Sequence, residues 1–101
     1  MPRTKKTSAP KSDTPDTLIY PNGRVVAMRP LNGVSYTLEE LYRVLECNMV
    51  EVVHTQVPDT ILICDEEGCF VNNPVRNVQA SNLAGVPIVG IALVCHTKRF
   101  K

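Results

Sequence analysis

The chain has 101 residues, of which 44% are hydrophobic and 21% are charged, and its formal net charge is +1. This length supports one domain with a single hydrophobic core. No apolar run approaches the roughly 20 residues of a membrane span, and the basic N-terminus has no apolar stretch behind it, so we expect a soluble, cytoplasmic protein without a signal peptide.

Charge is distributed unevenly along the chain. The first 16 residues are rich in Pro, Ser and Thr, and they contain the basic residues Arg3, Lys5, Lys6 and Lys11. Since such a segment buries too little surface to offset the entropy of ordering, we predict a disordered basic tail over residues 1–16. Residues 17–97 contain four basic and eight acidic residues, and we expect them to form the domain. Residues 98–101 form a second basic end.

The first predicted element is a β-hairpin. The mostly apolar segments 17–20 and 24–28 flank Pro21-Asn22-Gly23, in which Asn-Gly supplies the positive φ angles of a tight turn. A helix over about residues 37–47 follows, because Thr37 can cap its first amides and Glu40 can bond back to the cap. Its apolar positions recur every three or four residues and predict a stripe that packs on a sheet: Leu38, Leu41, Tyr42 and Leu45.

Strands dominate the remainder of the chain. Residues 49–54 and 60–64 form a second predicted strand pair, and the turn at residues 65–68 leads into a short return strand at residues 69–71. The apolar run of residues 88–94 predicts a central strand that is buried on both faces.

A short second helix over about residues 75–83 precedes that run, with Val75, Val78 and Leu83 facing inward. Pro87 is expected as the first residue of the central strand, because it cannot donate to the ladder. The predicted fold is therefore α+β, with a mostly antiparallel sheet of five to six strands and one main helix packed on it.

Several short segments carry a family resemblance when they are taken in order. They are LEEL at 38–41, VEVV at 50–53, DEEG at 65–68, PVRNVQA at 74–80 and IVG at 88–90. Over about residues 17–96 the chain resembles domain of unknown function 3846, a family of small proteins found largely in phages and mobile elements. It departs from the family at Cys47-Asn48, where paired glycines are usual. The resemblance implies a fold and a viral or mobile-element origin, and no established reaction.

Thiols and an imidazole near predicted strand ends raise the question of a zinc site. The residues concerned are Cys64, Cys69, Cys95 and His96. Thiolate and imidazole ligands suit zinc, but the close spacing of zinc knuckles is absent, and Cys95 and His96 point to opposite faces of a strand. Packing is the favoured role for these thiols, so we expect no metal and no cofactor. The same geometry argues against a Cys95–His96 nucleophile.

A carboxylate cluster in one turn and a polar segment are the remaining candidate sites. Asp65, Glu66 and Glu67 are expected to be solvated, because acid–base catalysis needs surroundings that separate their pKa values. The segment of residues 72–82 offers donors and acceptors to a phosphate or a nucleobase edge through Asn73, Arg76, Asn77 and Gln79. The alternative, which the composition favours, is that these amides cap turns and satisfy backbone groups.

We therefore expect a non-enzymatic binding protein of phage or viral type in the host cytoplasm, which engages a host protein or sequesters a small nucleotide-like ligand. The alternative is weak, non-specific nucleic-acid binding through the basic termini, with Arg3, Lys5, Lys6 and Lys11 as phosphate contacts. A simple solubility role competes with that function of the tail. Exposed sheet edges also predict a possible homodimer, because an unpaired edge is a pairing surface.

Overall fold

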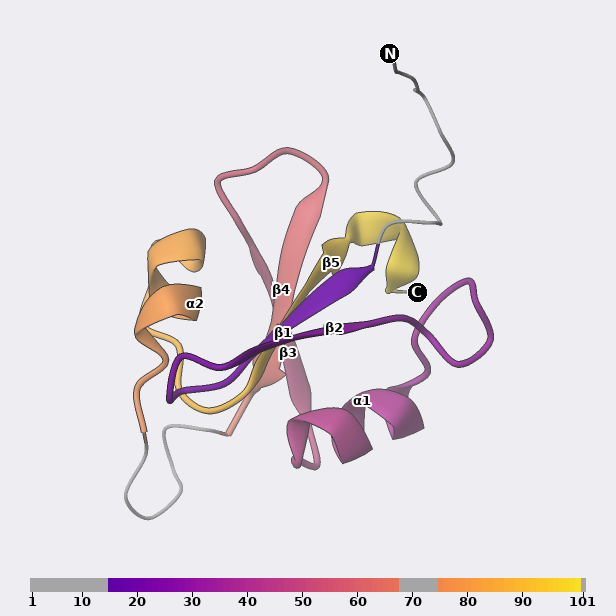
Figure 1. Ribbon diagram of the computed structural model, residues 1–101, viewed down its shortest axis with the longest axis horizontal. Helices are drawn as coiled ribbons and strands as arrows, with labels where there is room; N and C mark the ends of the chain where they lie inside the picture. Colours follow the sequence, from indigo (N-terminus) through magenta and orange to yellow (C-terminus); the bar gives the residue numbers. More distant parts are fainter. Residues whose placement is uncertain (1–14, 68–74, 101) are drawn as a thin grey trace.

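The computed structural model describes residues 15–67 and 75–100, which form a five-stranded antiparallel sheet with two helices (Figure 1). The sheet order is β2-β1-β5-β4-β3. In chain order the elements are β1 (Asp16–Ile19), β2 (Val25–Met28), α1 (Leu38–Leu45), β3 (Val50–His54), β4 (Thr60–Asp65), α2 (Val78–Ala84), β5 (Ala92–His96) and a 3₁₀ helix (Thr97–Arg99). The α+β class predicted from the sequence is confirmed. The predicted return strand at residues 69–71 lies outside the described residues.

The β1–β2 hairpin closes where the sequence places it, although its turn differs from the prediction. Gly23 has a φ of +93°, and its amide donates to the Tyr20 carbonyl over 3.0 Å. Asn22 is not among the described residues with a positive φ, and its Oδ1 accepts from the Arg24 amide over 2.9 Å. Gly23 alone therefore provides the left-handed position of this turn.

Helix α1 begins at the predicted threonine cap. Thr37 Oγ1 accepts from the Glu40 amide over 3.1 Å. The predicted return bond from Glu40 is wrong, because its buried carboxylate accepts from the Leu31 amide instead, over 3.0 Å. The helix ends at Leu45, before the predicted residue 47, since Glu46 takes a left-handed φ of 56°.

The two helices cover opposite faces of the sheet. Leu41 and Leu45 of α1 pack on one face, in a core that is completed by Leu18, Tyr36, Ile61, Ile63, Leu93 and Cys95. Ala80 and Ala84 of α2 pack on the other face, with Leu62, Cys64, Ile88 and Ala92. The predicted α1 stripe is only partly confirmed, since Leu38 is 49% exposed.

Strand β5 is the central strand, as predicted, but it begins at Ala92 rather than Pro87. Gly90 has a φ of +82°, which turns the chain before β5. Residues 88–90 pair instead with the segment before α2. The Asn77 backbone amide donates to the Ile88 carbonyl over 2.8 Å, and the Gly90 backbone amide donates to the Val75 carbonyl over 3.0 Å. This short pairing also delays α2, which begins at Val78 and not at residue 75.

The predicted inward face of α2 is wrong. Val75, Val78 and Leu83 are 58%, 61% and 36% exposed. The small residues Ala80, Ser81 and Ala84 are the buried ones, because they let the helix backbone lie close to the sheet.

The 3₁₀ helix joins the last strand to the first. Arg99 is buried, and its Nε lies 3.3 Å from Asp16 Oδ2. The fold therefore includes Asp16 and Arg99, which lie just outside the predicted domain of residues 17–97. Within the described part of the chain, no helix has the length and apolar character needed to cross a membrane.

Candidate functional site

Asn77, one of the predicted ligand-binding residues, is fully buried and bonded to the fold. Its Oδ1 accepts from the Ala80 amide over 3.1 Å and so caps α2. Its Nδ2 donates to the carbonyls of Ile19 (3.0 Å) and Gly90 (2.8 Å). These bonds tie α2, β1 and the turn before β5 together, so Asn77 positions the surface around it rather than reaching a ligand.

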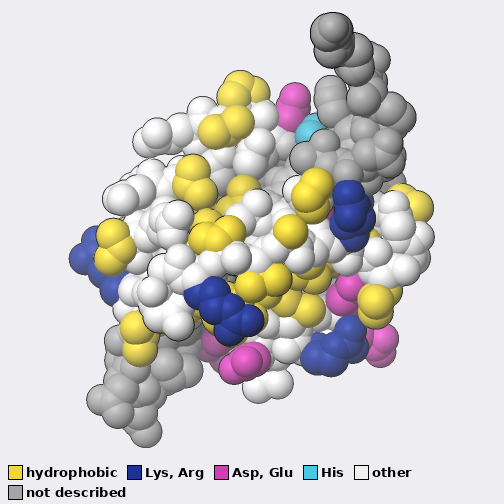
Figure 2. Space-filling view, in the orientation of Figure 1, with side chains coloured by type: hydrophobic (Ala, Val, Ile, Leu, Met, Phe, Trp, Pro, Cys, Tyr) yellow, Lys and Arg dark blue, Asp and Glu magenta, His cyan; other side chains and the backbone are white. Residues whose placement is uncertain are grey.

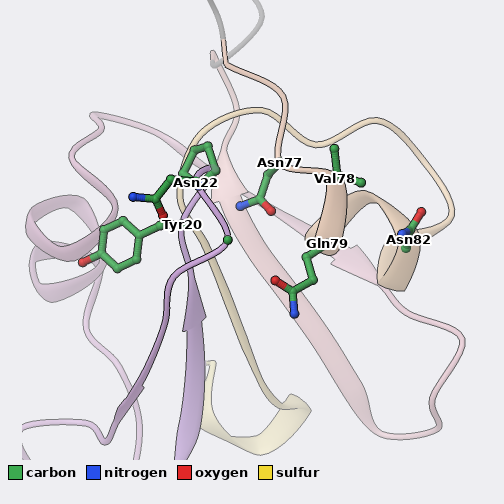
Figure 3. A pocket seen from close by; sticks show the side chains of 8 residues that line it. Tyr20, Asn22, Asn77, Val78, Gln79 and Asn82 are labelled. Carbon is green, nitrogen blue, oxygen red and sulfur yellow. The ribbon is translucent and has the colours of Figure 1, made fainter.

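A cleft of about 320 Å³ lies between the β1–β2 turn and α2 (Figure 3). It is lined by Tyr20, Pro21, Asn22, Gly23, Asn77, Val78, Gln79 and Asn82. Of the predicted ligand-binding residues, Asn77 and Gln79 line this cleft. Figure 3 shows the Tyr20 ring pointing away from α2, where it packs partly against the core on the α1 side. The ring is therefore poorly placed to stack on a ligand in the cleft.

Arg76 does not line this cleft; it borders a second hollow, of about 290 Å³, near the other end of α2. Ser81, Asn82, Gly85, Val86 and Pro87 complete its lining. Ser81 is buried, and its Oγ accepts from the Ile88 amide and donates to the Asn77 carbonyl, both over 2.7 Å. These bonds hold the far side of the hollow in place, while Arg76 and Asn82 are exposed.

The two hollows flank one outward surface, which we name the α2 surface. It consists of the exposed residues Val75, Arg76, Val78, Gln79, Asn82, Leu83 and Val86. From residue 75 to residue 95 the chain contains one charged residue, Arg76. The region of α2 in Figure 2 accordingly shows mainly apolar (yellow) and uncharged (white) atoms. Helix α1, in contrast, exposes Glu39 and Arg43.

The core of a protein interface is depleted of charged residues but enriched in arginine, and Arg76 is the one charged residue of the α2 surface. Isolated exposed apolar residues are common on any protein, but here four of them share one short helix and its flanks. Sequence reasoning missed this surface because it assigned Val75, Val78 and Leu83 to the core. The signal that was available is the pair of alanines at Ala80 and Ala84, spaced to form a close-packing face.

The thiols of the candidate zinc site lie apart. Cys95 belongs to the core on the α1 side and Cys64 to the core on the α2 side, so the sheet separates them. Burial raises the pKa of each thiol to about 12 and keeps it protonated. Among the described residues, no three His, Cys, Asp or Glu side chains are grouped to hold a metal ion. His96 Nδ1 accepts from the Lys98 amide over 3.1 Å and caps the 3₁₀ helix.

Some predicted site residues fall on parts of the chain that the structure does not describe. They are Cys69, Asn73 and the tail residues Arg3, Lys5, Lys6 and Lys11. The other turn candidates are described: Asp65 Oδ1 accepts from the Glu67 amide over 2.9 Å, and Glu66 and Glu67 are exposed. The carboxylates of this turn therefore stabilise the turn itself or face solvent.

A third hollow, of about 260 Å³, contains a buried ion pair that the sequence does not reveal. Its lining includes Asp16, Thr60, His96 and Arg99. Asp16 Oδ2 accepts from the Tyr36 hydroxyl over 2.5 Å in addition to facing Arg99. Burial, together with the adjacent Asp16 carboxylate, raises the pKa of Tyr36 well above its usual value. In this network the positive charge of Arg99 offsets the negative charge of Asp16. The network joins elements that are far apart in the sequence.

The family model of the domain of unknown function DUF3846 matches residues 17–100. The chain belongs to this family. The family resemblance predicted from the sequence is therefore confirmed. No curated protein and no solved structure matches the chain. The DUF3846 match runs from β1 to the residue after the 3₁₀ helix, and so it includes every residue of the α2 surface.

Proposed function

We propose that this DUF3846 protein acts without catalysis, as a binding protein that engages another protein through the α2 surface. One observation carries the proposal: α2 turns its small residues to the sheet and its larger apolar residues to solvent. Val78, at 61% exposure, contributes little to the core of its own domain. Covering such side chains with a partner is favourable by about 25 cal/mol per Å² of apolar surface removed from water.

The amides of this surface add specificity to the apolar contact. Gln79 and Asn82 are exposed, and each carboxamide both donates and accepts hydrogen bonds. In a buried interface such groups disfavour partners that leave them unpaired. The position of Asn77 supports this role, because its bonds hold the start of α2 rigidly against β1 and so preorganise the surface.

The resemblance to proteins of phages and mobile elements is the basis for the biological part of the proposal. A small accessory protein of such an element meets host proteins after its synthesis in the host cytoplasm. We therefore propose a host protein as the partner. A small nucleotide-like ligand in the cleft is less well supported, since the side-chain amide of Asn77 already donates to two backbone carbonyls and the Tyr20 ring points away from α2.

Two valines of similar exposure allow a matched test. Val78 lies on the α2 surface and Val34 lies in the loop before α1, at 61% and 65% exposure. Tagged wild-type protein, Val78→Glu and Val34→Glu would be expressed in host cells, crosslinked and purified, and the bound proteins quantified by mass spectrometry. We expect Val78→Glu to lower recovery of a specific partner at least about tenfold, equivalent to about 1.4 kcal/mol. Val34→Glu should retain it.

Equal recovery by both variants would overturn the α2 surface as the binding site. Circular dichroism of each variant tests whether the fold is kept. Native mass spectrometry of protein purified from the same cells tests the small-ligand alternative. A nucleotide-sized adduct that is lost in Gln79→Ala would contradict a protein partner, as would substrate turnover in a broad activity screen.

A further inference from the structure

We infer that the hollow beside Arg76 receives a single carboxylate of the partner, within a short segment whose neighbouring side chains are aliphatic; this inference rests on the proposed function. The hollow is defined by its lining residues Arg76, Ser81, Asn82, Gly85, Val86 and Pro87. With a volume of about 290 Å³ it has room for a side chain of a partner.

Charge complementarity identifies the group that the hollow would take. Among residues 15–67 and 75–100, no carboxylate forms an ion pair with Arg76. A guanidinium binds a carboxylate through two parallel hydrogen bonds, which gives both strength and orientation. Val86 and Pro87 line the same hollow, and on docking these apolar residues would help to exclude water from that pair and so strengthen it. Asn82, at the same hollow, supplies an additional amide donor.

The charge of the whole domain limits how acidic the partner segment can be. Residues 16–100 contain six basic and nine acidic residues, so the domain as a whole repels an acidic run. A single carboxylate that is flanked by aliphatic residues avoids this repulsion. Its neighbours would contact the exposed valines Val75 and Val78, which lie within two residues of Arg76 in the chain.

The size of α2 sets the length of the segment. Its 7 residues span only about 10 Å along the helix axis. An extended chain covers that distance in about three residues, at roughly 3.3 Å for each residue. Asn82 lines both the hollow and the cleft, so one short segment can contact both sites. We therefore expect a linear motif of about four to six residues, once flanking contacts are included.

A random peptide library provides a probe that does not require the natural partner. The library would be displayed, selected against the full-length protein, and the enriched peptides synthesised with a fluorescent label. We expect the enriched sequences to share one Asp or Glu beside aliphatic residues. Binding of such a peptide would be measured by fluorescence anisotropy with wild-type protein, Arg76→Glu and Arg43→Glu. Arg43 is the matched control, because it is an exposed arginine on α1.

We expect Arg76→Glu to weaken binding at least about tenfold and Arg43→Glu to change it less than about twofold. Replacing the acidic residue of the peptide by Lys should restore binding to Arg76→Glu and weaken binding to the wild type. Such a charge exchange would not rescue a variant whose defect is in folding. Enriched peptides without an acidic residue, or equal binding by both arginine variants, would overturn the inference.

The same peptides separate the failure of this inference from the failure of the proposed function. If peptide binding is lost in Val78→Glu but unchanged in Arg76→Glu, the α2 surface stands and the carboxylate site is wrong. If the library yields no binder, a linear motif is excluded, and the cellular comparison of Val78→Glu with Val34→Glu still decides the proposed function.

Discussion

At the scale of single residues, Asn77 shows why a polar side chain in a sequence can be interpreted in two ways. Its amide has the chemistry to bind a ligand and equally the chemistry to cap a helix, and both interpretations follow from the residue type. In the structure Asn77 is a helix cap, since its side chain bonds to the Ala80 amide and to two carbonyls remote in sequence. Gln79 and Arg76, from the same segment, remain exposed.

The importance of Asn77 can be tested against a second asparagine of the same helix region. Asn77→Ala removes a helix cap and the two side-chain hydrogen bonds to the carbonyls of Ile19 and Gly90, so we expect the free energy of unfolding to fall by roughly 2–4 kcal/mol. Asn82→Ala changes an exposed side chain and should alter it by less than about 0.5 kcal/mol. Urea denaturation followed by circular dichroism measures both. Similar midpoints for the two variants would contradict the anchoring role.

At the scale of elements, the adjacent strands β4 and β5 place one buried thiol in each core. Cys64 and Cys95 are 4% and 3% exposed, and burial raises the pKa of each from near 9 to about 12. Each thiol keeps its proton in the folded state at pH values where it would lose it in the unfolded chain. The resulting contribution to stability is complete below about pH 9 and is lost as the pH rises towards 12.

We therefore expect the free energy of unfolding to fall between pH 9 and pH 11, by up to about 1.4 kcal/mol per pH unit for each thiol. Urea titrations across this range, under reducing conditions, measure the slope. Cys64→Ala should flatten it, whatever its effect at neutral pH, while Cys95 and Tyr36 continue to contribute in the same direction. A slope that is unchanged in Cys64→Ala would show that this thiol ionises equally in both states.

Helix α2 and strand β5 also show which structural features a sequence pattern does not predict. The periodicity of α2 indicates which residues share a face, but it does not say which face packs on the sheet. Hydrophobicity favoured Val78 as the inward residue, whereas close packing selected Ala80 and Ala84. The start of β5 was misplaced for a related reason, because the apolar run gives no sign that Gly90 takes a positive φ and turns the chain.

At the scale of the whole molecule, the ion pair between Asp16 and Arg99 joins the first strand to the 3₁₀ helix after the last one. The Tyr36 amide donates to the Arg99 carbonyl over 2.7 Å, while the Tyr36 hydroxyl donates to Asp16. Three segments that are distant in the sequence thus meet in one buried network. Removing one charge from it would leave the opposite charge buried and uncompensated.

Arg99→Met is therefore expected to lower the free energy of unfolding by about 3–5 kcal/mol. The double variant Asp16→Asn, Arg99→Met removes both charges and should recover part of that loss. Lys98→Met, an exposed change in the same 3₁₀ helix, serves as the control and should be nearly neutral. Denaturation midpoints of the three variants measure these changes in stability. A double variant less stable than Arg99→Met would contradict a cost that comes from the uncompensated charge.

The sequence by itself determined the features that depend on neighbours a few residues apart: the hairpin at Gly23, the cap at Thr37, the order of helices and strands, and membership of the family. Only the tertiary structure decided the features that depend on contacts between distant segments. These are the turn at Gly90 that sets the start of β5, the outward face of α2, the bonds of Asn77 and the pairing of Asp16 with Arg99. Turns and caps are governed by local backbone sterics and hydrogen bonds, whereas burial is settled only when all the packed elements compete for the same core.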